Sequence, residues 1–176
     1  KSPSPEQLSH DFLWRIHARG PGRGEMVIFN RSHYEDVVVV RVHELVPEPI
    51  WRSRFEQINA FERGLVENDT TILKFFLHID RDEQKERLEA RLADPTKQWK
   101  FQMGDLAERK LWDQYQEAYE EAISNTSTEW APWYIIPANS KWYRNVIVSS
   151  IIVEALEKLN MKFPPASESL DGVTVD

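Results

Sequence analysis

The stretch Met26-Val27-Ile28-Phe29-Asn30-Arg31-Ser32-His33-Tyr34 carries the strongest signal in the chain for both fold and site. Its first four residues are apolar, and the turn-rich segment Gly20-Pro21-Gly22-Arg23-Gly24 precedes them. A short apolar run next to turn residues predicts a buried strand of a parallel sheet. Asn30 and Arg31 would then lie just past the carboxyl end of that strand, where open α/β sheets place ligands. Taken alone, the same residues also fit a strand end followed by an ordinary turn.

Other apolar segments alternate between strand and helix patterns. Further strands are predicted at Thr70 to Ile79 and at Trp133 to Pro137. Five helices are predicted: from Ser4 until Gly20-Pro21, over 51–67, from Arg81 to about Ala93, from Asp105 onward, and over 141–160. The helix from Asp105 carries the apolar stripe Trp112, Tyr115, Tyr119 and Ala122. Strands that alternate with helices predict an α/β fold with a parallel sheet flanked by helices.

The composition limits the classes of protein to consider. The 176 residues include 41% hydrophobic and 29% charged residues, which is typical of a globular domain, and no apolar run approaches the length of a membrane span. The net charge of −7 argues against a DNA or RNA partner, although a local basic cluster could still bind a polyanion. The absence of cysteine excludes disulfides and fits a cytoplasmic protein.

An ordered set of short motifs resembles the polyphosphate kinase 2 family. The motifs are His10-Asp11-Phe12-Leu13-Trp14-Arg15-Ile16-His17, Phe29-Asn30-Arg31-Ser32-His33-Tyr34-Glu35-Asp36, Leu73-Lys74-Phe75-Phe76-Leu77-His78-Ile79, Arg91-Leu92-Ala93-Asp94-Pro95, Trp99-Lys100-Phe101, Thr126-Ser127-Thr128, Ala131-Pro132-Trp133 and Lys141-Trp142-Tyr143-Arg144-Asn145. Each motif is weak alone, but their order covers about residues 3 to 160. The family's enzymes move phosphoryl groups between inorganic polyphosphate and nucleotides.

The resemblance implies a P-loop-kinase-like, thymidylate-kinase-like fold with a helical lid at about 81–124, a kinase domain over 1–162 and a loose tail over 163–176. It also makes residues 37–40 part of a helix, whereas their β-branched side chains favour a strand; we expect the helix, because tertiary context overrides propensity. No Gly-x-x-x-x-Gly-Lys-Ser/Thr motif occurs in the sequence. Since the family carries its phosphate-binding loop on an earlier strand, we expect the chain to be the later part of a kinase domain, inactive alone.

The resemblance and the local sequence together indicate site residues; Lys97 and Lys100 are included because they flank Trp99 in a segment with few acids, and His33 because it lies in the motif turn. Asn30, Arg31 and Arg91 are the expected catalytic residues, and the expected substrate-binding residues are His33, Arg87, Lys97, Lys100, Lys141 and Arg144. Phosphoryl transfer needs positioned phosphates and cations that neutralise their charge, which these residue types supply. Four of them have a plainer alternative: Arg87 and Arg91 could pair with Glu83 or Glu86 on the same helix, and Lys141 and Arg144 could lie on an ordinary helix surface.

The expected cofactor is Mg²⁺, but its ligands are not identified by the sequence. Many family members have an aspartate where this chain has Asn30, and an amide supplies no negative charge to the metal, although it accepts a hydrogen bond from a metal-bound water. The five histidines show no metal-ligand spacing such as His-Glu-x-x-His.

The expected function is a phosphotransferase acting between inorganic polyphosphate and a nucleoside mono- or diphosphate, without a DNA, RNA or membrane partner and as a homo-oligomer. Two alternatives stay open. One is a binding or assembly module that keeps the kinase scaffold without the reaction, and the other is a nucleotide kinase that uses ATP.

Overall fold

The computed structural model describes residues 4–164. Its elements are α1 (Pro5–Leu8), α2 (Trp14–His17), α3 (Glu35–Val42), α4 (Glu48–Glu67), β1 (Lys74–His78), α5 (Arg81–Ala93), the 3₁₀ helix η1 (Gln98–Lys100), α6 (Met103–Lys110), α7 (Trp112–Thr126), β2 (Trp133–Pro137) and α8 (Lys141–Lys158). Within these residues, no helix combines the length and apolar character needed to cross a bilayer. Most of the predicted tail, residues 165–176, lies outside the described part.

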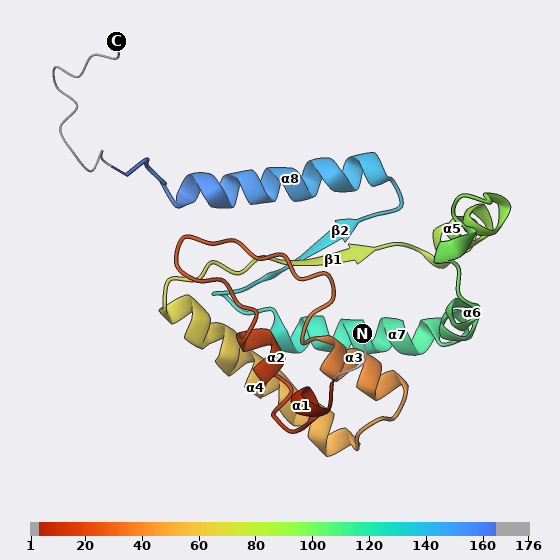
Figure 1. Ribbon diagram of the computed structural model, residues 1–176, viewed down its shortest axis with the longest axis horizontal. Coiled ribbons are helices and arrows are strands. Elements are labelled where there is room, and N and C mark those ends of the chain that lie inside the picture. The colour runs from red at the N-terminus through yellow and green to blue at the C-terminus, as the bar shows by residue number, and fades with distance from the viewer. Residues whose placement is uncertain (1–3, 165–176) are drawn as a thin grey trace, which may run out of the picture.

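β1 and β2 form a parallel pair in which Lys74 lies opposite Trp133 and His78 opposite Pro137. Helices α3, α4 and α7 cover one face of the pair and α8 covers the other, while α5 and α6 extend past the carboxyl ends of the strands (Figure 1). The predicted parallel α/β arrangement is therefore confirmed.

The core lies between the sheet and the three helices on its first face. It contains Tyr34, Val37, Val38, Trp51, Phe55, Ile58, Ala118 and Ala122. Two of the predictions for these helices are confirmed: residues 37–40 are helical, and the stripe that starts at Trp51 faces inward. Burial of these apolar side chains, at roughly 1.5–3 kcal/mol for each large one, outweighs the weak helix propensity of the valines.

The predicted strand at Met26 to Phe29 is wrong. These residues have no regular secondary structure and pair with no strand, and Met26 and Ile28 are 64% and 82% exposed. A strand requires a hydrogen-bonded neighbour, and among residues 4–164 β1 and β2 pair only with each other. Asn30 and Arg31 consequently follow an irregular segment rather than a strand.

Two predicted helices are interrupted. The capping box of Ser4 and Gln7 forms, but α1 ends at Leu8 and the chain restarts as α2. Between them the Asp11 side chain accepts the backbone N–H of Leu13 at 2.9 Å, which competes with a continuous helix. The helix predicted from Asp105 begins earlier, at Met103, and breaks at Leu111.

The two halves of that broken helix have different partners. The Arg109 guanidinium of α6 donates to the Arg81 carbonyl and the Gln84 side chain of α5, each at 2.7 Å. α7 instead packs on α3 and α4. The segment predicted as a lid, 81–124, thus consists of α5, η1, α6 and most of α7, and its movement stays a prediction.

Candidate functional site

The loops that follow β1 and β2 are joined to each other at the carboxyl ends of the strands. The backbone N–H of Ala138 donates to the His78 carbonyl at 2.7 Å. The Asn139 side chain accepts the backbone N–H of Asp80 at 3.1 Å and donates to its carboxylate at 2.6 Å. Asp80 also caps α5 by accepting the Glu83 N–H; this bond and the one from Asn139 lower the pKa of Asp80. This edge is therefore held in one arrangement.

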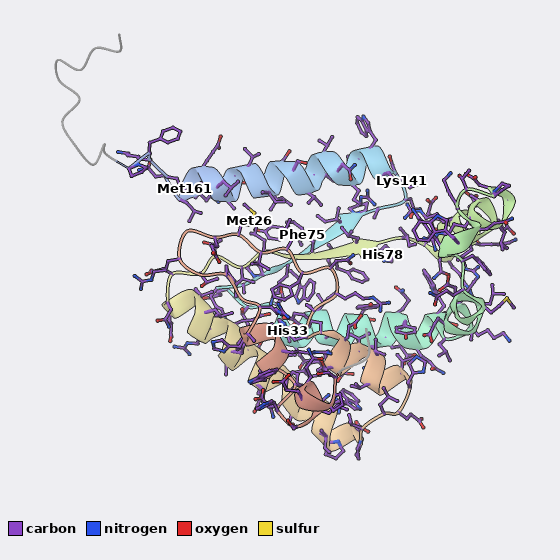
Figure 2. The ribbon with its side chains drawn as sticks, viewed as in Figure 1. Met26, His33, Phe75, His78, Lys141 and Met161 are labelled. Atoms are coloured by element: carbon purple, nitrogen blue, oxygen red, sulfur yellow. The ribbon has the colours of Figure 1, made fainter. Side chains whose placement is uncertain are left out.

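Basic residues lie along this edge. Arg87 donates to Glu83 at 2.6 Å and to the carbonyl oxygens of Ala138 and Asn139 at 2.7 and 3.1 Å. The alternative given by the sequence, an ion pair with Glu83, therefore forms, and Arg87 also joins α5 to the loop before α8. Lys141 begins α8 at the same end of the sheet as His78 (Figure 2).

Arg144 lies one turn further along α8. Its guanidinium donates to the Asn145 side chain at 3.0 and 2.8 Å. Lys141 is exposed and Arg144 is half-buried, so both remain accessible to a ligand. The structure thus places Arg87, Lys141 and Arg144 on adjoining segments of one edge.

The other predicted lid residues lie in the last turn of α5 and in the segment that follows it. Lys97 contacts Asp94 at 2.5 Å, and this contact together with hydrogen bonds from Thr96 lowers the pKa of Asp94 to about 2. The Lys100 ammonium lies 5.0 Å from the ring centre of Trp99, which is 78% exposed. Arg91 is half-buried in the last turn of α5. In this conformation, Lys97 and Lys100 each have one internal contact but remain exposed.

Arg31 lies in a tight turn before α3. Its φ of 68° is in the left-handed region, which few non-glycine residues adopt. The guanidinium contacts Glu35 at 3.1 Å, while 76% of the side chain is exposed. The pKa of Glu108 is lowered mainly by hydrogen bonds from Tyr115 and His43 and by the charge of His43. The positive charge of Arg31 lowers it further by a smaller amount. Arg31 therefore lies close enough to Glu108 of α6 for its charge to act on that carboxyl group.

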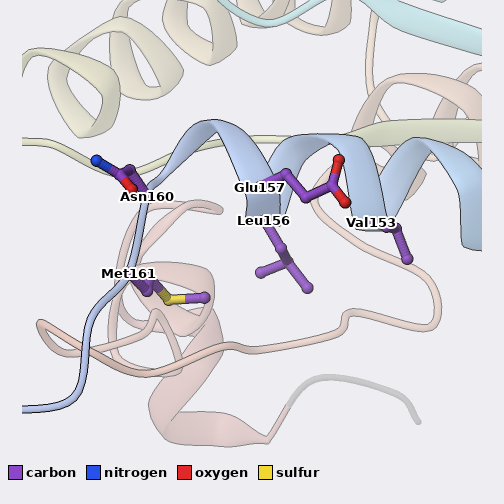
Figure 3. Close-up of a pocket in the computed structure, with 5 residues that line it drawn as sticks. All are labelled: Val153, Leu156, Glu157, Asn160 and Met161. Carbon is purple, nitrogen blue, oxygen red and sulfur yellow. The ribbon is translucent and has the colours of Figure 1, made fainter.

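Two shallow hollows are present on the surface of the described residues. One, of about 370 Å³, is lined by Val153, Leu156, Glu157, Asn160 and Met161 near the end of α8 (Figure 3). The other, of about 340 Å³, lies beside Phe76, Tyr119 and Ile135. None of the predicted site residues lines either hollow.

A cluster of buried polar side chains lies under the Arg31 turn. Glu62 of α4 and Lys74 of β1 are 1% and 6% exposed, and their charged groups are 2.6 Å apart. The Tyr34 hydroxyl donates to Glu62 at 2.6 Å, and His33 Nε2 lies 3.2 Å from the same carboxylate oxygen. We call Tyr34, Glu62, Lys74, Thr126 and Trp133 the buried polar junction.

Every donor of Lys74 is satisfied within the junction. Its ammonium donates to Glu62, to the Tyr34 hydroxyl at 3.0 Å and to the Thr126 carbonyl at 2.7 Å. The Trp133 indole donates to the Thr126 hydroxyl at 2.9 Å. The junction thus connects α4, both strands, the end of α7 and the turn before α3.

The junction keeps its ion pair charged despite burial. Burial alone would raise the pKa of Glu62, but the hydrogen bond from His33, the charge of Lys74 and the hydrogen bonds from Lys74 and Tyr34 reverse this and lower it. Burial lowers the pKa of Lys74, and its hydrogen bond to Glu62 and the charge of Glu62 oppose that shift. Burial and the Glu62 charge raise the pKa of Tyr34, so its hydroxyl stays a donor.

Sequence reasoning placed His33 in the substrate site and missed the junction. The structure buries His33 at 8% exposure, against Glu62. A signal for Glu62 was present, because positions 51, 55, 58 and 62 share one helix face and the first three are core residues. Lys74 is likewise a charge inside an apolar run, and two opposite charges at core positions indicate a buried pair.

The residues described here fit Mg²⁺ only in part. They contain no group of three or more His, Cys, Asp or Glu that could hold a metal ion. Mg²⁺ keeps several waters and binds through one or two carboxylates together with substrate phosphates. The exposed Asn30 amide could accept a hydrogen bond from a metal-bound water, so within residues 4–164 the chain offers this outer contact.

With this geometry in place, comparison with known proteins assigns the family. The model of the family described as "Polyphosphate kinase 2 (PPK2)" matches residues 1–164. The chain belongs to the polyphosphate kinase 2 family. A crystal structure of polyphosphate kinase 2 from Arthrobacter aurescens TC1 superposes with a TM-score of 0.94 at 48% identity, covering 97% of this chain and 60% of that one. The fold is therefore that of the P-loop-kinase-like polyphosphate kinase 2 enzymes.

Relatives in the family carry related names. The AMP/ADP-polyphosphate phosphotransferase of Meiothermus ruber is 57% identical over 99% of this chain and 65% of its own length. The ADP-polyphosphate phosphotransferase of Rhodopseudomonas palustris is 46% identical over 93% of this chain and 61% of its own. The chain thus spans a little under two thirds of these relatives.

Proposed function

We propose that the protein containing this chain moves a terminal phosphoryl group directly between inorganic polyphosphate and a nucleoside mono- or diphosphate. The observation that carries the proposal is the exposed Arg31, held in a left-handed turn next to a buried ion pair. A guanidinium presented in this way suits phosphate oxygens, to which it can donate two parallel hydrogen bonds. The family and the names of its members support the same chemistry.

The basic residues divide into two groups in this proposal. Arg31 and Arg91 contact the transferring phosphates, and Lys141 and Arg144 contact the polyphosphate chain. Arg87, Lys97, Lys100 and His33 are further substrate-binding residues; in this conformation all four have internal partners, which a bound phosphate would have to replace or share. Mg²⁺ would neutralise phosphate charge, with Asn30 accepting a hydrogen bond from a metal-bound water.

Both AMP and ADP are proposed as acceptors, because the relative with 57% identity is named for both nucleotides. We further propose a cytoplasmic homo-oligomer without a nucleic-acid or membrane partner. The absence of cysteine and the net charge of −7 support this location and these partners.

The test is a transfer assay with the whole protein, Mg²⁺ and either AMP or ADP, with polyphosphate or ATP as the donor. The proposal predicts ADP from AMP and ATP from ADP when polyphosphate is the donor. Product only with ATP as the donor would identify an ATP-dependent nucleotide kinase instead. Binding of polyphosphate without any product would identify a binding module. The chain of 176 residues, which contains no glycine loop with a lysine, is expected to form no product alone.

A further inference from the structure

The buried polar junction is built from segments that are far apart in the sequence. Tyr34 precedes α3, Glu62 lies on α4 and Lys74 starts β1, and both Tyr34 and Lys74 contact the Glu62 carboxylate at 2.6 Å. In Figure 2, His33 marks the place of the junction beneath the strands. All three of these side chains are less than a tenth exposed.

A buried ion pair is a poor means of stabilising a core. Two charges lose their hydration, and apolar residues of similar volume often give equal or greater stability. Trp51, Phe55 and Ile58 already fill the same face of α4, so an apolar residue at position 62 would extend that stripe. Hydrogen bonds differ from apolar contacts in being directional. The junction therefore fixes the direction and register of the groups bonded to it.

The group fixed most directly is the turn that carries Arg31. Within this turn, the backbone N–H of Glu35 donates to the Ser32 carbonyl at 3.2 Å, and that of Asp36 donates to the His33 carbonyl at 3.0 Å. Tyr34 is thus linked to Arg31 through a short, internally bonded segment. Arg31 also keeps a φ of 68°, which persists only when its surroundings impose it. A shift of the Tyr34 ring would be transmitted to Arg31.

We propose that Tyr34, Glu62 and Lys74 are positioning residues for phosphoryl transfer, which hold the Arg31 turn in register with the carboxyl ends of β1 and β2. This inference rests on the proposed function of Arg31. Lys74 is the connection to the sheet, because it is the first residue of β1 and donates to both Glu62 and the Tyr34 hydroxyl. None of the three side chains has to touch substrate in this role.

Tyr34→Phe is the variant that tests the proposal, because it removes only the hydroxyl and leaves the Glu62–Lys74 pair intact. In the whole protein we expect kcat to fall about tenfold, as for loss of a hydrogen bond to a charged group, with KM for polyphosphate and nucleotide changed less than about twofold. Tyr134→Phe is the matched control: Tyr134 follows Trp133 on β2 and pairs with Phe75, but alternation along the strand puts its side chain on the face opposite the junction, so its change should leave kcat unaltered.

A double-mutant cycle separates positioning from general stability. If Tyr34 acts through Arg31, Tyr34→Phe should lower kcat much less when Arg31→Gln is already present. Equal reductions in both backgrounds would overturn the proposal. An unchanged kcat in Tyr34→Phe, with only a lowered melting temperature, would also overturn it.

A measurement without turnover separates this proposal from the proposed function. In hydrogen exchange, Tyr34→Phe should speed exchange of the Glu35 and Asp36 backbone amides, which are hydrogen-bonded within the turn, while those of α4 stay protected. Unchanged exchange at these two amides would overturn the positioning role. A wild-type protein that lacks transfer from polyphosphate would instead refute the proposed function, and the exchange result would still show if the junction holds the turn.

Discussion

Glu62 and Lys74 are 1% and 6% exposed and lie 2.6 Å apart, whereas the side chains of Arg31 and Lys97 are 76% and 57% exposed. The first pair contacts only protein and is fully hydrogen-bonded. The second two residues lie on open surface, each with one acidic neighbour. The same kinds of charged group thus do different work in the two regions: the buried pair fixes geometry, and the exposed residues remain available to a ligand.

This difference has an energetic consequence. Removing one partner of a buried pair leaves an uncompensated charge and costs about 3–5 kcal/mol, whereas an exposed pair is worth about 0–1 kcal/mol. Substitutions in the two regions should therefore separate stability from activity. Changes in the junction should alter both, and changes at the surface should alter activity alone.

The largest effect is expected for Glu62→Gln. This change keeps the volume of the side chain but leaves the Lys74 ammonium without a countercharge, so the free energy of unfolding should fall by about 3–5 kcal/mol. Urea denaturation of the 176-residue chain measures it. Glu67→Gln is the matched control on the same helix, where an exposed pair with Arg63 predicts a loss of about 0.5 kcal/mol or less. Equal losses in the two variants would contradict the distinction between the regions.

The second prediction concerns pH. The pKa of Glu62 is lowered in the folded state, so its contribution to stability is present above the unfolded-state pKa of about 4.3 and is lost as pH falls through the folded-state value. The groups facing the Glu62 carboxylate are Lys74, Tyr34 and His33. The difference in unfolding free energy between wild type and Glu62→Gln should therefore shrink below about pH 4. A difference that stays constant between pH 6 and pH 3 would show that this carboxylate is not ionised in the fold.

The smallest effect on stability is expected for Lys141→Gln and Arg144→Gln. Neither change removes a buried contact, so the free energy of unfolding should change by about 0.5 kcal/mol or less. In the whole protein the same changes should weaken the use of long polyphosphate and flatten its dependence on salt, because contacts to phosphates are lost. Variants that unfold, or that keep wild-type kinetics with long polyphosphate, would show these residues to be scaffold or plain surface.

Much of the fold could be predicted from the sequence because local signals agreed with the tertiary structure. β2 has the predicted bounds, and the stripe of α4 and the Asp80 cap of α5 were also predicted correctly. The prediction of a strand at Met26 to Phe29 failed, because an apolar run indicates strand propensity but not the presence of a neighbouring strand to pair with. The break at Leu111 reflects the separate partners of α6 and α7, which periodicity does not reveal.

The candidate site was predictable only in part. Arg31, Lys141 and Arg144 stand in motifs and were named from the sequence, but their mutual placement depends on tertiary contacts. Glu62 was missed because a glutamate on a helix is usually exposed, and its burial depends on Lys74, twelve residues later and on another element. A buried polar network becomes evident only when both partners are considered at once.

The most direct test of the central claim is kcat of the whole protein carrying Arg31→Gln, measured with polyphosphate, Mg²⁺ and AMP or ADP. Arg63→Gln, on the exposed face of α4, is the control and should retain wild-type kcat. If the junction presents Arg31 to the transferring phosphates, Arg31→Gln should lower kcat about a hundredfold or more while the melting temperature stays unchanged. A folded Arg31→Gln protein with wild-type kcat would contradict the claim.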